Sequence, residues 1–358
     1  IKLMSEVKNE REENGISSMK LKIVHLLVLL AVGLSLFASG CTGPGNSQVN
    51  DSTGKEVEIA GTDMPITVAV SILPQADFVE KVGGNKVKTV VIIPPGADPH
   101  TYEPSPRELG EVSEARMYVT LGVDMPFEKV WIDRFETINS GTLIVNSSNG
   151  IELKKLAAHD HHEGEGEEEH AEELEVDHAN ESEENHENES EDGREEMELD
   201  PHIWTSPSNA KIMVENIYER LVEIDPGNET YYSQNRDAYL KELDALDARI
   251  REKLEGREER NFMVYHPSWG YFAADYNLTM IPVEIEGKEP SAQDLAKLVD
   301  LAKEKHVKVI FVQSQFNTRS AQAIAEEIGG EVVVVDPLAK DYIANMDKVS
   351  DIFARNLV

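Results

Sequence analysis

The most informative chemical feature of the chain is a tripeptide that occurs twice. Asp98-Pro99-His100 is followed by Ser105-Pro106, and Asp200-Pro201-His202 is followed by Ser206-Pro207. Ser-Pro is a good helix start, because serine accepts hydrogen bonds from free backbone N–H groups and proline at the first helical position loses none. We therefore place both histidines on loops just before helices. Either histidine alone would most simply be an ordinary loop residue.

Two further metal-ligand residue types follow apolar runs directly. His266 follows the run 262–265, and Asp336 follows the run 332–335. Open α/β sheets bind ligands beyond the carboxyl ends of their strands, where His266, Asp336 and His100 should lie if these runs are strands. Asp336 alone could be a turn residue before Pro337. Four donors at equivalent strand ends are harder to explain in that way.

These four residues together predict a metal site. Three imidazole nitrogens and one carboxylate oxygen make a tetrahedral set suited to Zn²⁺. Imidazole-rich sites also suit copper, iron or nickel, whereas manganese, calcium and magnesium prefer more oxygen ligands. We predict one tight zinc site formed by His100, His202, His266 and Asp336. Because protons compete for imidazoles, we expect the affinity to fall below about pH 6.

The elements that must position these residues alternate between strands and helices. Strand candidates are the runs 66–71, 87–93, 118–121, 143–146, 262–265, 280–285, 307–312 and 332–335. The amphipathic segments between them predict βαβ units. The predicted fold is therefore α/β, with two lobes that each hold a mainly parallel sheet flanked by helices. Apolar residues at helical spacing in 229–256 predict one long backbone helix that joins the lobes.

The acidic residues are unevenly distributed along the chain. The formal charge is −34, which argues against nucleic acid as a partner, because neutralising phosphates requires clustered Lys and Arg. Residues 160–200 hold 21 Asp and Glu against one Arg. We predict an N-terminal lobe at 64–228 that contains a disordered insert at 157–198, and a C-terminal lobe at 257–358.

The insert also carries histidines, at positions His159, His161, His162, His170, His178 and His186. It could be a solvated loop without a function. Imidazoles are zinc ligands, however, and negative charge concentrates divalent cations. We therefore expect weak extra zinc sites in this loop, beside the tight one.

The N-terminal region predicts export. We interpret residues 1–18 as a non-native upstream extension, 19–40 as a lipoprotein signal peptide and 41–63 as a flexible tether. Small residues before Cys41 resemble a lipobox, so we expect Cys41 to be lipidated. The alternative is an uncleaved membrane anchor. Because Cys41 is the only cysteine, the chain has no intramolecular disulfide and no cysteine-only zinc site.

The chain resembles the metal-binding receptors of ABC importers, the cluster A-I solute-binding proteins, and above all their zinc-specific branch. Besides the two Asp-Pro-His segments, the resemblance rests on His266 with Gly270-Tyr271-Phe272, on Glu289-Pro290-Ser291 and on Asp336-Pro337-Leu338. It implies that one ion is held between two lobes, by His100 and His202 from one and His266 and Asp336 from the other. Some zinc members use water or a nearby acid in place of the fourth ligand.

The resemblance also implies partners and a location. We expect an importer permease and its ATPase as partners, a lipid anchor on the outer face of the cytoplasmic membrane, and a monomer. The manganese and iron branch commonly has a carboxylate where this chain has His266, which favours zinc. Asp98, Asp200 and Glu289 are candidates for orienting the ligands, with surface or capping roles as the alternative.

Three other functions remain as alternatives. One is a manganese or iron receptor of the same family. Another is a zinc hydrolase, since three protein ligands and an open position also describe catalytic zinc. The chain has no His-Glu-x-x-His segment and no nucleophile elbow, so we do not expect an enzyme. The last is an adhesin whose metal only stabilises the fold.

Overall fold

The structure is a computed structural model that describes residues 64–123, 125–156, 199–285, 287–316 and 318–357. Several predictions concern segments outside these residues, namely the upstream extension 1–18, the signal peptide 19–40, the tether 41–63 with Cys41, and the insert 157–198. None of the helices in the described ranges combines the length and the apolar character that crossing a bilayer requires.

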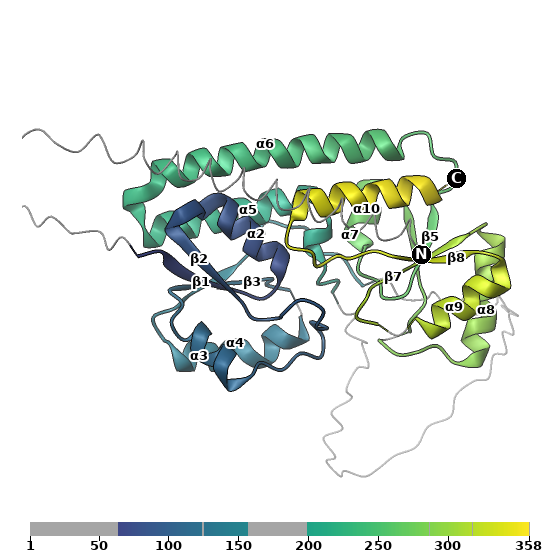
Figure 1. Cartoon of the computed structure of the whole chain (residues 1–358), viewed down its shortest axis with the longest axis horizontal. Coiled ribbons are helices and arrows are strands. Elements are labelled where there is room, and N and C mark those ends of the chain that lie inside the picture. The colour runs from purple at the N-terminus through teal and green to yellow at the C-terminus, as the bar shows by residue number, and fades with distance from the viewer. Residues whose placement is uncertain (1–63, 124, 157–198, 286, 317, 358) are drawn as a thin grey trace, which may run out of the picture. The chain divides into compact units, whose positions relative to one another are not determined.

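The first lobe is built on a four-stranded parallel sheet with the order β2-β1-β3-β4. Its strands are β1 (Ile66–Val70), β2 (Val87–Val91), β3 (Met117–Thr120) and β4 (Leu143–Asn146). Its helices are α2 (Leu73–Gly83), α3 (Pro106–Val112), α4 (Pro126–Ile138) and α5 (Pro207–Ile224), with short 3-10 turns at η1 (Gly84–Lys86), η2 (Ile203–Thr205) and η3 (Pro226–Asn228). Helices α2 and α5 lie on one side of this sheet and α3 and α4 on the other (Figure 1). Every residue of β3 is buried, as expected for a central parallel strand.

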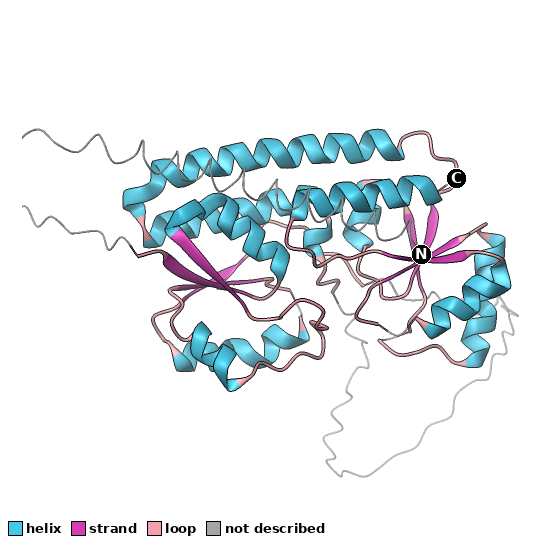
Figure 2. Ribbon diagram, viewed as in Figure 1, coloured by secondary structure: helices cyan, strands magenta, loops and turns pink. Residues whose placement is uncertain are grey.

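The second lobe repeats this strand order, as β6-β5-β7-β8, and is again wholly parallel. Its strands are β5 (Asn261–Val264), β6 (Thr279–Pro282), β7 (Val309–Val312) and β8 (Glu331–Val334). Its helices are α7 (Gly270–Asp275), α8 (Ala292–Glu304), α9 (Arg319–Ile328) and α10 (Tyr342–Asn356), and Figure 2 shows them around the fan of strands. The fold class predicted from the sequence is thereby confirmed.

Side-chain alternation along β5 and β7 divides the core of the second lobe. Phe262 and Phe311 pack on one face of the sheet against Phe353 of α10, with ring centroids 4.8 and 4.4 Å away. Met263 and Ile310 point to the other face and join the core beneath α8 and α9. Because neighbouring residues of a strand face opposite ways, each strand supplies both layers.

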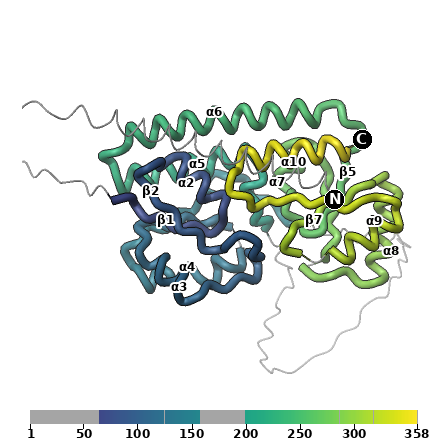
Figure 3. The backbone as a smooth tube through the Cα atoms, in the orientation of Figure 1, coloured from purple at the N-terminus to yellow at the C-terminus, as the bar shows by residue number. Residues whose placement is uncertain are grey.

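The predicted long helix is α6 (Glu229–Leu254), with 26 residues. It lies along α5 and contacts α2 in the first lobe and α10 in the second (Figure 3). The apolar stripe that is buried consists of Tyr232, Tyr239, Leu243, Leu246, Ile250 and Leu254. The Tyr239 hydroxyl donates to Asp77 Oδ2 of α2 (2.9 Å), and Lys253 Nζ pairs with Asp347 of α10 (3.0 Å). One helix therefore binds both lobes.

The two lobes also meet directly at Trp204. This side chain is 1% exposed, and its Nε1–H donates to the Pro337 carbonyl oxygen in the second lobe (2.7 Å). The Trp204 carbonyl oxygen in turn accepts from the Tyr342 hydroxyl (2.8 Å). A salt bridge between Lys340 and Glu80 (2.9 Å) adds a further link between the lobes. The lobes are thus joined beside the segment that carries His202.

Candidate metal centre

His100 lies on the loop between β2 and α3. Beyond β2 the chain continues the sheet pairing, since Ile92 N–H donates to Val70 O, and then turns through Gly96, whose φ of +82° favours glycine. Asp98 Oδ1 accepts from the backbone N–H of His100 (2.9 Å), which fixes the turn. Ser105 caps α3 as predicted from the Ser-Pro pair.

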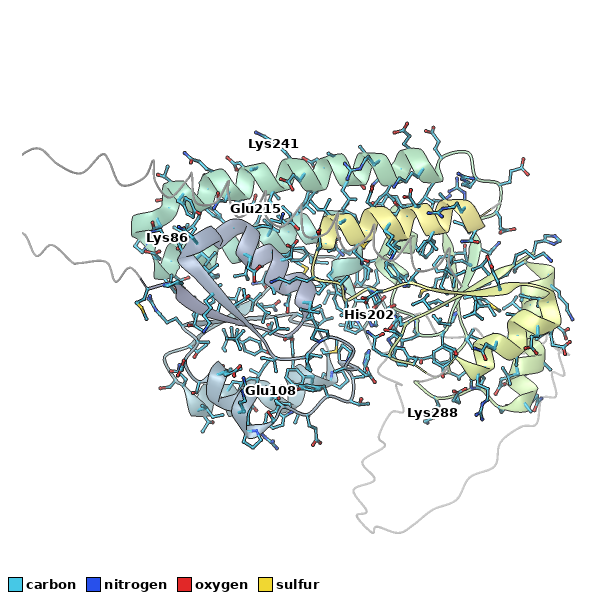
Figure 4. The ribbon with its side chains drawn as sticks, viewed as in Figure 1. Lys86, Glu108, His202, Glu215, Lys241 and Lys288 are labelled. Carbon is cyan, nitrogen blue, oxygen red and sulfur yellow. The ribbon has the colours of Figure 1, made fainter. Side chains whose placement is uncertain are left out.

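His202 lies in the second copy of the tripeptide and is held more firmly. Asp200 Oδ1 accepts from both the backbone N–H (2.9 Å) and the ring Nδ1–H (2.7 Å) of His202. Asp200 is 1% exposed and His202 3% exposed. Ser206 caps α5 through Asn209 N–H (3.0 Å), again as the sequence predicted. In Figure 4 the labelled His202 lies among side chains of both lobes.

His266 comes from the second lobe, two residues after β5. Its ring Nδ1–H donates to Glu284 Oε1 (2.6 Å), and Glu284 is buried two residues beyond β6. Because β5 and β6 are parallel neighbours, the two residues lie at the same edge of the sheet. The ring of Phe316 stacks on the His266 ring, with centroids 4.7 Å apart and planes 21° apart.

The three histidines form one group, in which a ligand atom from each lies within 4.8 Å of those of the other two. The Nε2 atoms of His202 and His266 are 3.1 Å apart. Since each Nδ1 donates to a carboxylate, each Nε2 carries a lone pair, and the two lone pairs face each other. Tetrahedral Zn–N bonds of 2.0–2.1 Å place two ligand nitrogens about 3.3 Å apart, close to this spacing. The residues therefore fit a zinc ion.

Burial favours the neutral form of two of the three imidazoles. Burial, together with His202 and His266 nearby, lowers the pKa of His100 to about 3. Burial also lowers the pKa of His202, although its hydrogen bond to Asp200 acts in the opposite direction. Metal ligands must be deprotonated, so His100 and His202 are prepared for a cation at neutral pH.

Asp336 lies outside this three-histidine group. It follows β8 as predicted, separated from the strand by Val335, and its Oδ1 accepts from Leu338 N–H (2.8 Å). Asp336 lines a cavity of 230 Å³ between the lobes, together with Ile93 and Gln315. Its role as the fourth ligand stays a prediction.

The orienting residues differ in part from those proposed on the sequence. Asp200 does hold a ligand ring, but among the described residues the Asp98 carboxylate accepts from its own loop, from His100 N–H and Thr101 Oγ1. Glu289 accepts from the Ser320 hydroxyl instead of from a histidine ring. The residue that holds His266 is Glu284, which sequence reasoning did not find.

Known proteins show the same organisation. The family described as "Zinc-uptake complex component A periplasmic" matches residues 68–356. The high-affinity zinc uptake system protein ZnuA of Bacillus subtilis is 30% identical over 307 residues, which cover 85% of each chain.

Solved structures agree with the sequence relatives. A crystal structure of ZnuA is 37% identical, with a TM-score of 0.70, and the match covers 82% of this chain and 100% of that one. A ZnuA deletion mutant with zinc bound has a TM-score of 0.69 at 37% identity and covers 82% of this chain and 98% of its own. The family match extends over most of the chain and includes all three histidines. The chain therefore belongs to the family of periplasmic A components of zinc-uptake complexes.

Proposed function

We propose that this protein is a high-affinity receptor that captures Zn²⁺ outside the cytoplasm and delivers it to an ABC importer. The observation that carries the proposal is the pair of Nε2 atoms 3.1 Å apart, each belonging to a ring whose Nδ1–H is bound by a buried carboxylate. Two fixed lone pairs repel each other unless a cation lies between them. The ion is the cargo, and the imidazoles of His100, His202 and His266 are its proposed ligands.

Zinc is favoured over manganese by the donor set. Three neutral imidazoles suit zinc, whereas manganese prefers carboxylate and water oxygens. The fourth position would be taken by Asp336 or by water. Changing Asp336 to Ala distinguishes these two, since only a ligand role makes that carboxylate necessary for tight binding.

Release is expected to use the division of ligands between the lobes. His100 and His202 come from the first lobe, and His266 comes from the second. A small separation of the lobes when the receptor docks on its permease would therefore break the coordination set. Because α6 contacts both lobes, it would limit that movement to a small range.

The sequence also supports proposals for the anchor, the partners and the oligomeric state of the receptor. We propose a lipid anchor at Cys41, an importer permease and its ATPase as partners, and a monomeric receptor without enzymatic turnover. The family places such proteins outside the cytoplasm. Mass spectrometry of membrane-extracted protein tests the anchor, since lipidation adds acyl mass to a chain that begins at Cys41.

The His-rich insert is proposed to bind further zinc ions weakly. Deleting residues 159–198 should lower the metal stoichiometry and leave the tight site intact. Loss of the tight site in the deletion variant would contradict this separation of roles.

Metal analysis of single alanine variants tests the whole proposal. The wild-type protein should retain one tightly bound equivalent of zinc after dialysis, and the His100, His202 and His266 variants should lose it. Retention of a full equivalent by the His266 variant would contradict the zinc assignment. Tighter retention of manganese than of zinc by the wild type would favour the manganese branch.

A further inference from the structure

His266 is held from two sides, and only one of them is a hydrogen bond. Glu284 accepts a hydrogen bond from Nδ1 of His266, at the edge of the imidazole. The Phe316 ring covers one face of the imidazole, with the two ring centroids 4.7 Å apart. Phe316 lies on the segment after β7, which is a parallel neighbour of β5. The residue thus comes from the same sheet edge as the ligand it covers.

A second contact binds the segment of Phe316 to the loop of His266. The side-chain amide of Gln313 donates to Ser268 Oγ, and both residues are buried. Ser268 N–H in turn donates to the His266 carbonyl oxygen (2.8 Å), and Phe316 N–H donates to the Gln313 carbonyl oxygen (3.3 Å). The aromatic ring is therefore fixed relative to the same loop that carries the imidazole.

We propose that Phe316 is a positioning residue for zinc capture, which holds the plane of the His266 ring so that Nε2 points at the ion. The inference rests on the proposed function. The Cβ–Cγ bond and one hydrogen bond through Nδ1 hold one edge of the ring but still allow the ring plane to tilt about that edge. A flat aromatic face against the imidazole removes that freedom and keeps water from the same face.

The position of Phe316 in the fold indicates how its stacking on His266 serves zinc capture and release. Ser314 and Gln315, just before it, line the 230 Å³ cavity opposite Ile93 and Pro94 of the first lobe. Phe316, Glu284 and His266 all belong to the second lobe. When the lobes separate, His266 therefore keeps its orientation and remains a prepared ligand, while His100 and His202 move with the first lobe.

The test compares variants at Phe316 with a matched control. Zinc affinity is measured by competition with a chromophoric chelator for the wild type, F316A, F316Y and L295A. Leu295 is a suitable control because it is half-buried and packs against the same core cluster as Phe316, but it lies on α8, which carries none of the proposed ligands. Aromatic pairs contribute about 0.5–1.5 kcal/mol beyond their area, so F316A should raise Kd roughly 2- to 12-fold. F316Y and L295A should both keep the zinc affinity of the wild type.

Cobalt provides a readout that loss of stability alone does not change. The visible absorption of bound Co²⁺ depends on ligand geometry, so F316A should alter the band shape while F316Y and L295A reproduce the wild-type spectrum. If F316A fails to fold, F316L takes its place, because leucine keeps most of the apolar volume but has no aromatic face. F316L should then show the raised Kd and the altered cobalt spectrum expected for F316A.

Two outcomes separate this inference from the proposed function. A wild-type protein that binds no zinc refutes the proposed function, and the inference about Phe316 with it. A wild-type protein that binds zinc tightly, with F316A or F316L equal to it in Kd and in the cobalt spectrum, refutes the inference alone.

Discussion

The Nε2 atoms of His202 and His266 lie 3.1 Å apart although the two residues come from different lobes. Each ring is oriented by a carboxylate of its own lobe, Asp200 for His202 and Glu284 for His266. The geometry of the site therefore depends on two carboxylates as much as on the imidazoles. Residues that orient metal ligands typically change metal affinity 10- to 100-fold when they are removed.

Glu284→Ala should weaken zinc binding by roughly 10- to 100-fold, because His266 loses the acceptor that fixes its tautomer. Glu289→Ala is the control, since Glu289 accepts from the hydroxyls of Ser320 and Tyr265 and binds no histidine ring. Competition titration against a zinc chelator measures both variants. Equal affinities for the two would show that the hydrogen bond from His266 to Glu284 does not orient the ligand.

Burial lowers the pH at which protons should compete with zinc for two of the three rings. An imidazole with the ordinary pKa of about 6.5 loses metal affinity below that pH. The pKa of His100 is lowered to about 3, so this ring stays neutral well below pH 6 in this arrangement, and burial lowers the pKa of His202 as well. Proton competition at these two rings should therefore begin at a lower pH than the sequence alone suggested.

Zinc titrations between pH 8 and pH 4 check this window. A steep loss of affinity that starts near pH 6 would show that the metal-free protein exposes these rings to water, as separated lobes would do.

The sequence predicted the ligand loops because their signals are local. His266 and Asp336 follow short apolar runs, and the observed strands β5 and β8 differ from the predicted ones by one residue at each end. Ser-Pro pairs marked the starts of α3 and α5 correctly, since capping depends only on neighbouring residues.

Glu284 and Phe316 were missed for identifiable reasons. Glu284 falls inside the predicted strand at 280–285, whereas β6 ends at Pro282 and leaves Glu284 at the sheet edge. Phe316 lies in a loop without periodicity, and its stack on His266 depends on how two loops far apart in the sequence meet. Contacts of this kind arise from tertiary packing and have no local signal.

A buried acid in the first lobe should make the stability of the metal-free protein depend on pH. Glu128 is 2% exposed and accepts from Leu121 N–H (2.7 Å), Gly122 N–H (3.1 Å) and the Ser71 hydroxyl. Burial raises its pKa from 4.5 to about 7, against the effect of these hydrogen bonds. Between these two values the folded state binds the proton and the unfolded state does not, so stability falls as the pH rises from about 4.5 to about 7.

The free energy of unfolding should change by about 3 kcal/mol across this range, because a tenfold change in proton affinity corresponds to about 1.4 kcal/mol. Urea unfolding of the wild type and of Glu128→Gln at pH 5 and pH 8 measures the change. The loss of stability between the two pH values should be smaller in the variant by about this amount. Glu108→Gln, at a partly exposed cap of α3, should change the pH dependence little, and equal behaviour of the two variants would contradict the prediction.

The contact between the lobes at Trp204 should govern how fast zinc leaves. Trp204→Phe removes the indole N–H that donates to the Pro337 carbonyl oxygen and keeps most of the apolar ring. A hydrogen bond of this kind contributes about 0.5–1.5 kcal/mol, so the lobes should separate more readily and zinc should dissociate roughly 2- to 12-fold faster. Stopped-flow transfer of zinc to excess chelator measures the rate.

Trp269→Phe is the matched control for this prediction. Trp269 is as deeply buried as Trp204, but its indole N–H has no hydrogen-bond partner among the described residues, and it packs within the second lobe against Phe272 and Phe353. The same change of side chain there removes no bond between the lobes. Dissociation rates that rise equally in both variants would assign the effect to loss of packing. A rise confined to Trp204→Phe would assign it to the link between the lobes, which is the movement that release to a permease requires.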